Sequence, residues 1–169
     1  ELIGEAIKDS DRKKLIITSK VSPENLSYNN LLNSARNSLK KLKTNYIDLY
    51  LIHRPNPEIP LKETMKAMNE LMDSKIVKNI GVSMFSIEQI KEAEKYSKYP
   101  IVANQMKYSL WNLTDLKTIE YCQKNDIMII AYKVFGRGKL ITNNISFLSN
   151  LAKRYNKKES QIILNWVSS

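Results

Sequence analysis

The sequence predicts an α/β fold with a parallel sheet, of the (β/α)8 TIM-barrel type. Five short apolar runs alternate with helical patterns, and a residue capable of chemistry follows each run. The runs and the residues that follow them are 15–19 with Lys20, 46–52 with His53, 80–82 with Ser83, 102–104 with Gln105, and 127–131 with Tyr132. A parallel β/α barrel builds its site at the carboxyl ends of its strands. We therefore expect these five side chains to converge.

The segments between the runs each predict one crossover helix, which parallel pairing requires. Their apolar residues recur at helical spacing. The helices are expected to begin at Ser27, Leu61 and Ser86, and the last to span 116–122. Ser86 with Gln89 fits a capping box. The expected inner faces carry Leu31, Leu32, Ala35, Leu39 and Leu42; Met65, Met68, Leu71 and Met72; and Ile87, Ile90 and Ala93.

Both ends of the chain are also expected to be helical. Residues 2–7 suggest the end of a first helix, and 133–144 after the last strand is expected to be a loop containing Gly136 and Gly138. Strands that are apolar throughout indicate a sheet covered on both faces. Two closing helices carry Leu148, Leu151, Ala152 and Tyr155, and Ile162, Ile163, Trp166 and Val167.

Glycine content and length decide between the parallel architectures. An open doubly wound sheet normally carries a glycine-rich phosphate turn after its first strand. The sequence has four glycines and no G-x-G-x-x-G motif, so the barrel is favoured. A complete barrel needs roughly 250 residues, whereas this sequence has 169 residues. We expect residues 1–169 to form a single domain, an incomplete barrel.

Composition limits the possible functions. Lys+Arg 27 and Asp+Glu 17 give a formal net charge of +10, which also suits nucleic acid or a phosphorylated ligand. The basic residues lie mainly on expected helix exteriors and turns, so a solvated surface is the preferred interpretation and nucleic-acid binding the weaker alternative. The single Cys122 excludes an internal disulfide, and no apolar run reaches the roughly 18 residues of a membrane span. We expect a soluble cytoplasmic protein without nucleic-acid or membrane partners.

Two of the five residues can carry charge or a proton. Lys20 at a strand end is usually only a surface charge, but inside a barrel mouth its ammonium would lower the pKa of a nearby phenol or carboxyl group. His53 is the only histidine, and taken alone such a residue is more often structural than catalytic. One histidine and one cysteine cannot form a multi-histidine metal site, and we predict no metal.

The other three residues offer neutral groups. The hydroxyl of Ser83 and the amide of Gln105 match the donor and acceptor of a carboxamide, although strand-end capping is the simpler interpretation of either residue alone. Tyr132 offers a flat ring for stacking. Lys133 and Arg137 follow in a glycine-bearing loop, where β/α barrels often bind phosphate.

Together these segments resemble the aldo-keto reductases. The matching parts are Lys20 with Pro23, residues 38–55, Gly-Val-Ser-Met-Phe at 81–85, residues 104–108 and Ile-Ala-Tyr at 130–132, in order and over nearly the whole chain. The resemblance implies a (β/α)8 barrel that binds NADPH without a Rossmann fold and reduces an aldehyde or ketone to an alcohol by hydride transfer. NADH is not excluded. The chain would supply about strands 3 to 7, truncated at both ends.

The resemblance implies two catalytic residues. Lys20 matches the lysine that lowers the pKa of a proton-donating tyrosine, and His53 matches the histidine that orients and polarises the carbonyl. The cofactor would supply hydride, and the protein orientation and a proton. The family's tyrosine and its partner aspartate follow the second barrel strand, which would lie before Glu1. We therefore expect little or no reduction by this chain alone.

The resemblance also implies a cofactor site with two departures. Met84 stands where asparagine is usual, and Lys-Val-Phe at 133–135 replaces the usual Ser-Pro-Leu. These departures leave open an alternative, a non-catalytic nicotinamide-binding or scaffold remnant of the family. Two unpaired barrel edges are also expected to cause self-association. The cofactor-binding candidates are Ser83, Asn104 and Gln105 for the carboxamide, with Ser83 and Gln105 preferred, Tyr132 for stacking, and Lys133 and Arg137 in the following loop.

Overall fold

The computed structural model describes residues 1–113 and 115–169. Five strands form one sheet in the order β1-β2-β3-β4-β5, and every neighbouring pair is parallel. This confirms the expected α/β class with a parallel sheet. The strands are β1 (Thr18–Val21), β2 (Leu49–Ile52), β3 (Ile80–Ser83), β4 (Ile101–Lys107) and β5 (Met128–Tyr132).

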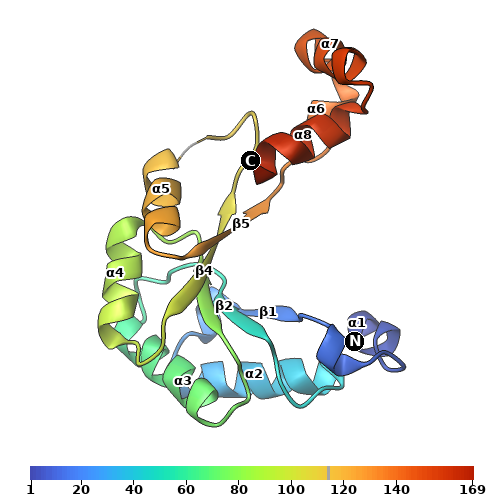
Figure 1. The fold of residues 1–169 in the computed structure, drawn as a ribbon. Helices are drawn as coiled ribbons and strands as arrows, with labels where there is room; N and C mark the ends of the chain where they lie inside the picture. The colour runs from blue at the N-terminus through green and yellow to red at the C-terminus, as the bar shows by residue number, and fades with distance from the viewer. Residues whose placement is uncertain (114) are drawn as a thin grey trace.

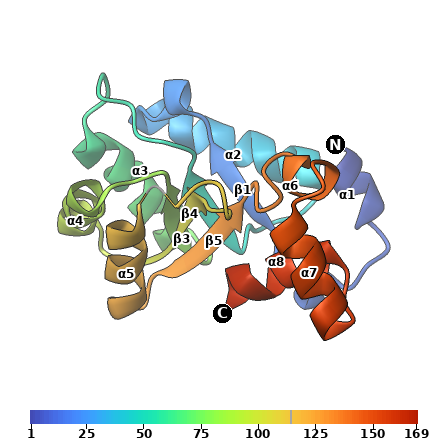
Figure 2. The same cartoon turned by 90° about the horizontal axis from the view of Figure 1, so that it is seen from above.

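The helices between the strands lie on one side of the sheet. Figure 1 shows α2 to α5 on the convex side of a curved sheet, while the concave side is open, and Figure 2 shows the same arrangement from above. The crossover helices are α2 (Tyr28–Leu42), α3 (Leu61–Asp73), α4 (Ile87–Tyr96) and α5 (Leu116–Lys124). The remaining helices are α1 (Leu2–Ala6), α6 (Lys139–Thr142), α7 (Ser146–Tyr155) and α8 (Glu159–Ser168), with 3-10 turns at Arg12–Lys14 and Pro23–Asn25.

The main core lies between the convex face of the sheet and these helices. Strand residues that point outward, such as Tyr50 and Val82, pack against the apolar stripes of α2, α3 and α4. Fully burying a Leu, Ile or Met side chain stabilises a fold by about 1.5–3 kcal/mol. The stripes were predicted correctly for most positions, and the buried ones include Leu31, Leu32, Ala35, Leu42, Met65, Met68, Leu71, Ile90 and Ala93.

A smaller apolar cluster lies on the concave face. Leu49, Leu51 and Ala103 form it, because alternate residues of a strand point to opposite faces. Gly81 permits this packing, since a Cβ there would lie 2.7 Å from the Leu51 Cδ2 atom and 2.7 Å from the Ala103 carbonyl oxygen.

The first strand starts three residues later than predicted. Residues 15–17 belong to the approach from the 3-10 turn, because Arg12 Nη1 donates to the Leu15 carbonyl and the Ile17 amide donates to the carboxylate of Asp48. Lys20 consequently lies within β1 and not after it. Likewise β4 continues to Lys107, so Gln105 lies inside that strand.

The expectation that both sheet faces are covered holds only for the centre of the sheet. All residues of β2 and β3 are buried, whereas Met128 at the start of β5 is 65% exposed. The helices cover the convex face alone, and the concave face is covered only where neighbouring side chains meet across it. The outer strands β1 and β5 each have a free edge in the described part of the chain.

The last three helices form a separate small cluster. Leu140, Leu148 and Ile163 are its buried centre, and Tyr108 stacks on Trp166 with ring centroids 5.0 Å apart. Figure 1 shows α6 and α7 projecting from the end of β5. Two expectations for this region were wrong: α6 interrupts the predicted loop, and Tyr155 is exposed.

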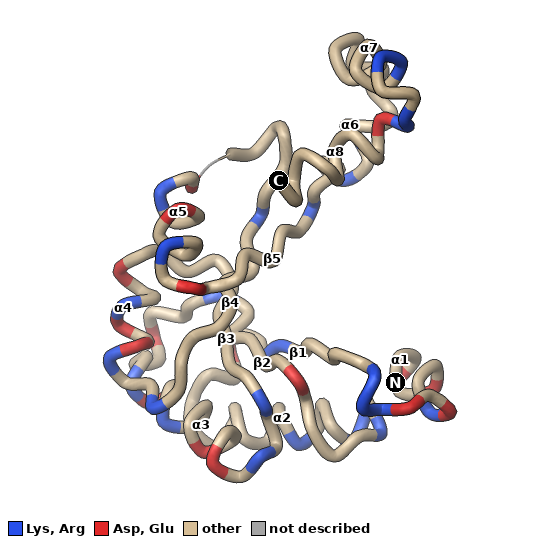
Figure 3. The backbone as a smooth tube through the Cα atoms, in the orientation of Figure 1, with Lys and Arg blue, Asp and Glu red and all other residues tan. Residues whose placement is uncertain are grey.

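Charged residues are spread over the molecule. Figure 3 shows Lys and Arg along the outer helices and turns, mixed with Asp and Glu, and not in a single stripe. Within the described residues, no helix is both long and apolar enough to cross a bilayer, and no group of three potential metal ligands is brought together.

Candidate active site

Lys20 and Gln105 meet across the concave face of the sheet. The Lys20 ammonium donates to Gln105 Oε1 at 2.6 Å, although β2 and β3 lie between their strands. Only side chains on the inner face of a curved sheet can make such a contact. The structure therefore brings together two of the predicted residues that are 85 positions apart.

Ser83 is the direct neighbour of Gln105 on the next strand. The two residues are paired in the β3–β4 register, and the Ser83 side chain is only 2% exposed. Paired residues of adjacent strands point to the same face, so the hydroxyl and the amide lie side by side at the carboxyl edge. Their donors and acceptors match those of a carboxamide.

Tyr132 reaches the same edge from β5. Its hydroxyl lies 3.3 Å from the sulfur of Met84, the residue that follows β3. The Met84 amide donates to the Gln105 carbonyl at 3.0 Å. Met84 therefore connects Tyr132 to the Ser83–Gln105 pair. The sequence did not predict this connection, because Met84 stood out there only as a departure from the usual asparagine.

His53 lies directly after β2. Its amide donates to the Val21 carbonyl at 3.0 Å, which holds the residue between β1 and β3. Leu49 and Leu51 face the concave side, and strand alternation places His53 there as well. The imidazole is exposed at the same edge as the Lys20 ammonium.

Asn104 does not join this group. Its Nδ2 donates to the Phe85 carbonyl at 3.0 Å, and the side chain is fully buried on the convex face beside Cys122. Burial raises the pKa of the Cys122 thiol. Because Asn104 and Gln105 are consecutive in one strand, only Gln105 faces the concave side.

Lys133 and Arg137 lie in the loop after Tyr132. Both are exposed, and their φ angles are positive, 55° and 59°. Gly136 and Gly138 also have positive φ angles, of 56° and 89°. The Lys133 ammonium lies 5.3 Å from the centroid of the Tyr132 ring. The loop therefore presents the Lys133 ammonium beside Tyr132, on a backbone that two glycines help to turn.

The chain is similar to known proteins over nearly its whole length. Residues 1–167 match the model of the aldo/keto reductase family. The chain belongs to this family. Glyoxal reductase from Bacillus subtilis strain 168 is 33% identical over 168 residues, which cover 98% of this chain and 59% of that protein. The chain thus spans about three fifths of the length of the curated relatives it matches.

Solved aldo-keto reductases show the same fold. A thermostable member in complex with the inhibitor epalrestat matches with a TM-score of 0.93 and 43% identity, over 98% of this chain and 61% of that one. A Klebsiella pneumoniae member in complex with NADPH matches with a TM-score of 0.88 and 26% identity, over 98% and 60%. The five strands thus correspond to part of an aldo-keto reductase barrel.

The concave edge fits the nicotinamide end of the cofactor on chemical grounds. It offers the hydroxyl of Ser83 and the amide of Gln105 for a carboxamide, and the ring of Tyr132 for stacking. Tyr50 on β2 takes no part: it faces the helices, and its burial raises its pKa to about 12.

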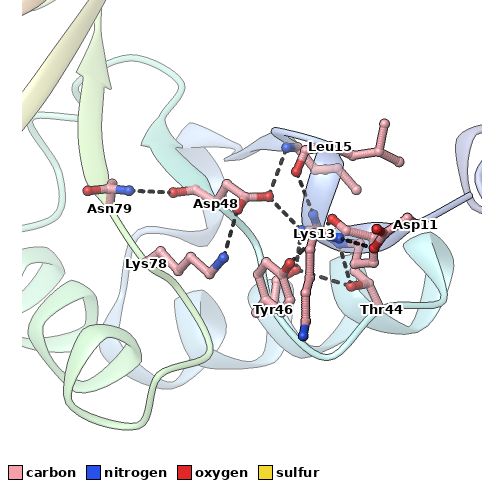
Figure 4. Close-up of polar contacts among 10 residues, drawn as sticks. Asp11, Lys13, Leu15, Thr44, Tyr46, Asp48, Lys78 and Asn79 are labelled. Carbon is pink, nitrogen blue, oxygen red and sulfur yellow. Dashed lines mark hydrogen bonds and ion pairs between the residues drawn. The ribbon is translucent and has the colours of Figure 1, made fainter.

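The opposite edge of this aldo-keto reductase sheet holds a second polar cluster. Asp48 accepts from Arg12 Nη2 at 2.6 Å, from the Ile17 amide at 3.0 Å and from Lys78 Nζ at 3.2 Å. Figure 4 shows the contact of Lys78 with Asp48. The centroid of the Tyr46 ring lies 3.9 Å from the Arg12 guanidinium carbon and 3.8 Å from the Lys78 ammonium nitrogen. In barrels this edge serves stability, whereas the carboxyl edge holds the site.

Proposed function

We propose that this chain is the central part of an NADPH-dependent carbonyl reductase that converts a small aldehyde or ketone to an alcohol. The observation that supports it best is the contact of Lys20 with Gln105 across the concave face, with Ser83 paired to Gln105. These contacts bring an ammonium group, an amide and a hydroxyl group together at one edge of the sheet. Relatives described as glyoxal reductase and methylglyoxal reductase support a small carbonyl substrate.

In the proposed reaction the protein binds and orients both partners. The bound cofactor supplies hydride. Ser83 and Gln105 hold the carboxamide, and Tyr132 covers one face of the ring. His53 donates a hydrogen bond to the carbonyl oxygen, and the Lys20 ammonium stabilises negative charge that develops there as hydride reaches the carbonyl carbon. Water supplies the proton that completes the alcohol. Lys133 and Arg137 bind phosphate. Asn104 is left out because it faces the core.

We place the five strands at about positions 3 to 7 of the barrel and treat residues 1–169 as one domain of a cytoplasmic enzyme. The chain spans 59–62% of the reductases named above, and none of the residues proposed for this site is a proton-donating tyrosine. Turnover by the 169-residue chain is therefore expected to be low.

The second candidate is a non-catalytic nicotinamide-binding protein of the same family. Met84 favours it, because this residue takes a left-handed conformation at a position where asparagine is usual in the family. This candidate binds the nicotinamide cofactor as the first one does, but it does not reduce a carbonyl group.

Binding of NADPH to the 169-residue chain tests the proposal. We expect a saturable change in NADPH fluorescence, and we expect Gln105→Ala to raise Kd about tenfold, because two hydrogen bonds of about 0.5–1.5 kcal/mol each are lost. Gln123→Ala, an exposed glutamine on α5, is the matched control and should leave Kd unchanged.

Three outcomes distinguish the candidates. Binding with slow reduction of methylglyoxal that disappears in His53→Ala supports the reductase. Binding without any turnover supports the nicotinamide site that both candidates share and counts against reduction by this chain alone. Absence of binding, or equal Kd values for Gln105→Ala and the control, rejects both. A parallel titration with NADH measures the cofactor preference.

A further inference from the structure

Met84 links two strands that are not neighbours. It follows β3, yet its sulfur lies 3.3 Å from the Tyr132 hydroxyl on β5, with β4 between the two strands. The thioether has no hydrogen to donate, so the phenol donates and the sulfur accepts. This contact reaches over the strand that carries Gln105.

The backbone of Met84 determines the direction of this side chain. Its φ of 61° is left-handed, a conformation that is uncommon for a non-glycine residue and costs about 1 kcal/mol or more. The amide of Met84 also donates to the Gln105 carbonyl at 3.0 Å. The side chain therefore starts from an anchored position and leaves the convex core, where the next residue, Phe85, is buried.

Few neighbouring groups fix the orientation of the Tyr132 side chain. It is only partly buried, it is the last residue of the free-edged strand β5, and Lys133 approaches its ring. A phenol at a strand end rotates about two side-chain torsions unless something holds it. Among the described residues, the hydrogen bond from its hydroxyl to Met84 restrains the far end of the ring.

We propose that Met84 is a positioning residue for Tyr132: its sulfur holds the phenol so that the ring faces the nicotinamide. This rests on the proposed function. Met84 acts through Tyr132, and it compensates at this position for the absence of a carboxamide-binding asparagine. A thioether contact to an aromatic residue contributes modestly, so a small effect on affinity is expected.

Two substitutions remove the two halves of the contact. Met84→Leu removes the sulfur and keeps a similar volume, and leucine is disfavoured at positive φ just as methionine is. Tyr132→Phe removes the hydroxyl and keeps the ring. We expect each variant to raise the Kd for NADPH about threefold, the value that corresponds to one modest hydrogen bond.

The double variant distinguishes a coupled pair from two independent effects. Because both changes remove the same contact, Met84→Leu with Tyr132→Phe should also raise Kd about threefold, and not about ninefold. Met128→Leu is the matched control: this exposed methionine lies on β5 four positions before Tyr132 and should leave Kd unchanged.

A measurement without cofactor tests the contact itself. In protein labelled with ¹³C at the methionine methyl groups, Met84→Leu assigns the Met84 signal. That signal should move in Tyr132→Phe, while the Met128 signal should not. The midpoint of thermal unfolding should be nearly equal in the two single variants, since neither changed side chain lies in the buried core.

The outcomes separate this inference from the proposed function. If the parent chain binds no NADPH, the proposed function fails and this inference fails with it. If the parent chain binds NADPH but Met84→Leu binds equally well, or the effects of the two variants multiply, only the positioning role is rejected. An unmoved Met84 signal in Tyr132→Phe rejects the contact.

Discussion

Asp48 shows how one residue supports the amino edge of the sheet. Its carboxylate is 13% exposed and accepts hydrogen bonds from Arg12, Lys78 and the Ile17 amide. The Arg12 guanidinium also donates hydrogen bonds to the Thr44 hydroxyl and to the backbone carbonyls of Leu15 and Tyr46. The segment before β1 is thereby tied to the start of β2.

Replacing this carboxylate should destabilise the fold. Asp48→Asn keeps the shape but removes the charge, and hydrogen bonds to charged groups contribute about 1.5–3 kcal/mol each. We expect the free energy of unfolding in urea to fall by about 2 kcal/mol. Glu5→Gln, which breaks an exposed ion pair with Lys43, is the control and should change it little. Equal effects of both substitutions would contradict this account.

The same residue makes a pH-dependent contribution. Desolvation by burial raises the pKa of Asp48, but hydrogen bonds from Ile17, Arg12 and Lys78 outweigh it and hold the pKa below the ordinary 3.8. A lowered pKa means that the stabilisation is fully present above 3.8 and is lost as the pH falls through the lower, folded-state value. The urea midpoint of Asp48→Asn should therefore fall less on acidification than that of the parent chain.

At the scale of elements, local signals determined where helices begin. Ser86 accepts from the Gln89 amide and Gln89 Oε1 accepts from the Ser86 amide, which completes the predicted capping box of α4. Ser27 occupies the corresponding place before α2, but its side chain makes no capping hydrogen bond there. The two serines therefore form a natural comparison.

Substitution of each serine tests the caps. Ser86→Ala should lower the free energy of unfolding by about 1 kcal/mol, the usual value of a capping side chain, because the Gln89 amide loses its acceptor. Ser27→Ala should have a clearly smaller effect. Urea unfolding followed by circular dichroism measures both. A larger loss for Ser27→Ala would refute the assignment.

At the scale of the whole molecule, the open sheet determines how the isolated chain behaves. The backbone groups on the free edges of β1 and β5 can pair with another chain, and Met128 exposes apolar surface beside one of them. The net charge of +10 opposes association at low salt. Association should therefore increase when salt screens this charge.

Light scattering after size exclusion can measure this association. We expect the apparent mass of the 169-residue chain to rise with protein and salt concentration, and Met128→Lys to reduce the rise by adding charge beside the β5 edge. Phe147→Lys adds the same charge at an exposed position on α7, which projects away from the sheet, and is the comparison variant. A constant monomer mass under all conditions would contradict the role of the edges.

Local sequence determined the elements and their order, because helical spacing, caps and apolar runs act over a few residues. It also identified Lys20, His53, Ser83, Gln105 and Tyr132 as residues that share one edge, since parallel strands bring their carboxyl ends together. It preferred Gln105 but kept Asn104 as a second carboxamide candidate, because which of two adjacent residues faces the concave side depends on strand register.

Tertiary structure alone decided the contacts between distant residues. The start of β1 depends on Arg12 and Asp48, 36 positions apart. The contacts of Lys20 with Gln105 and of Met84 with Tyr132 depend on curvature that brings β1 to β4 and β3 to β5. No local pattern encodes such curvature. It arises from the twist of the strands and the packing of helices on one face, and it determines which side chains meet.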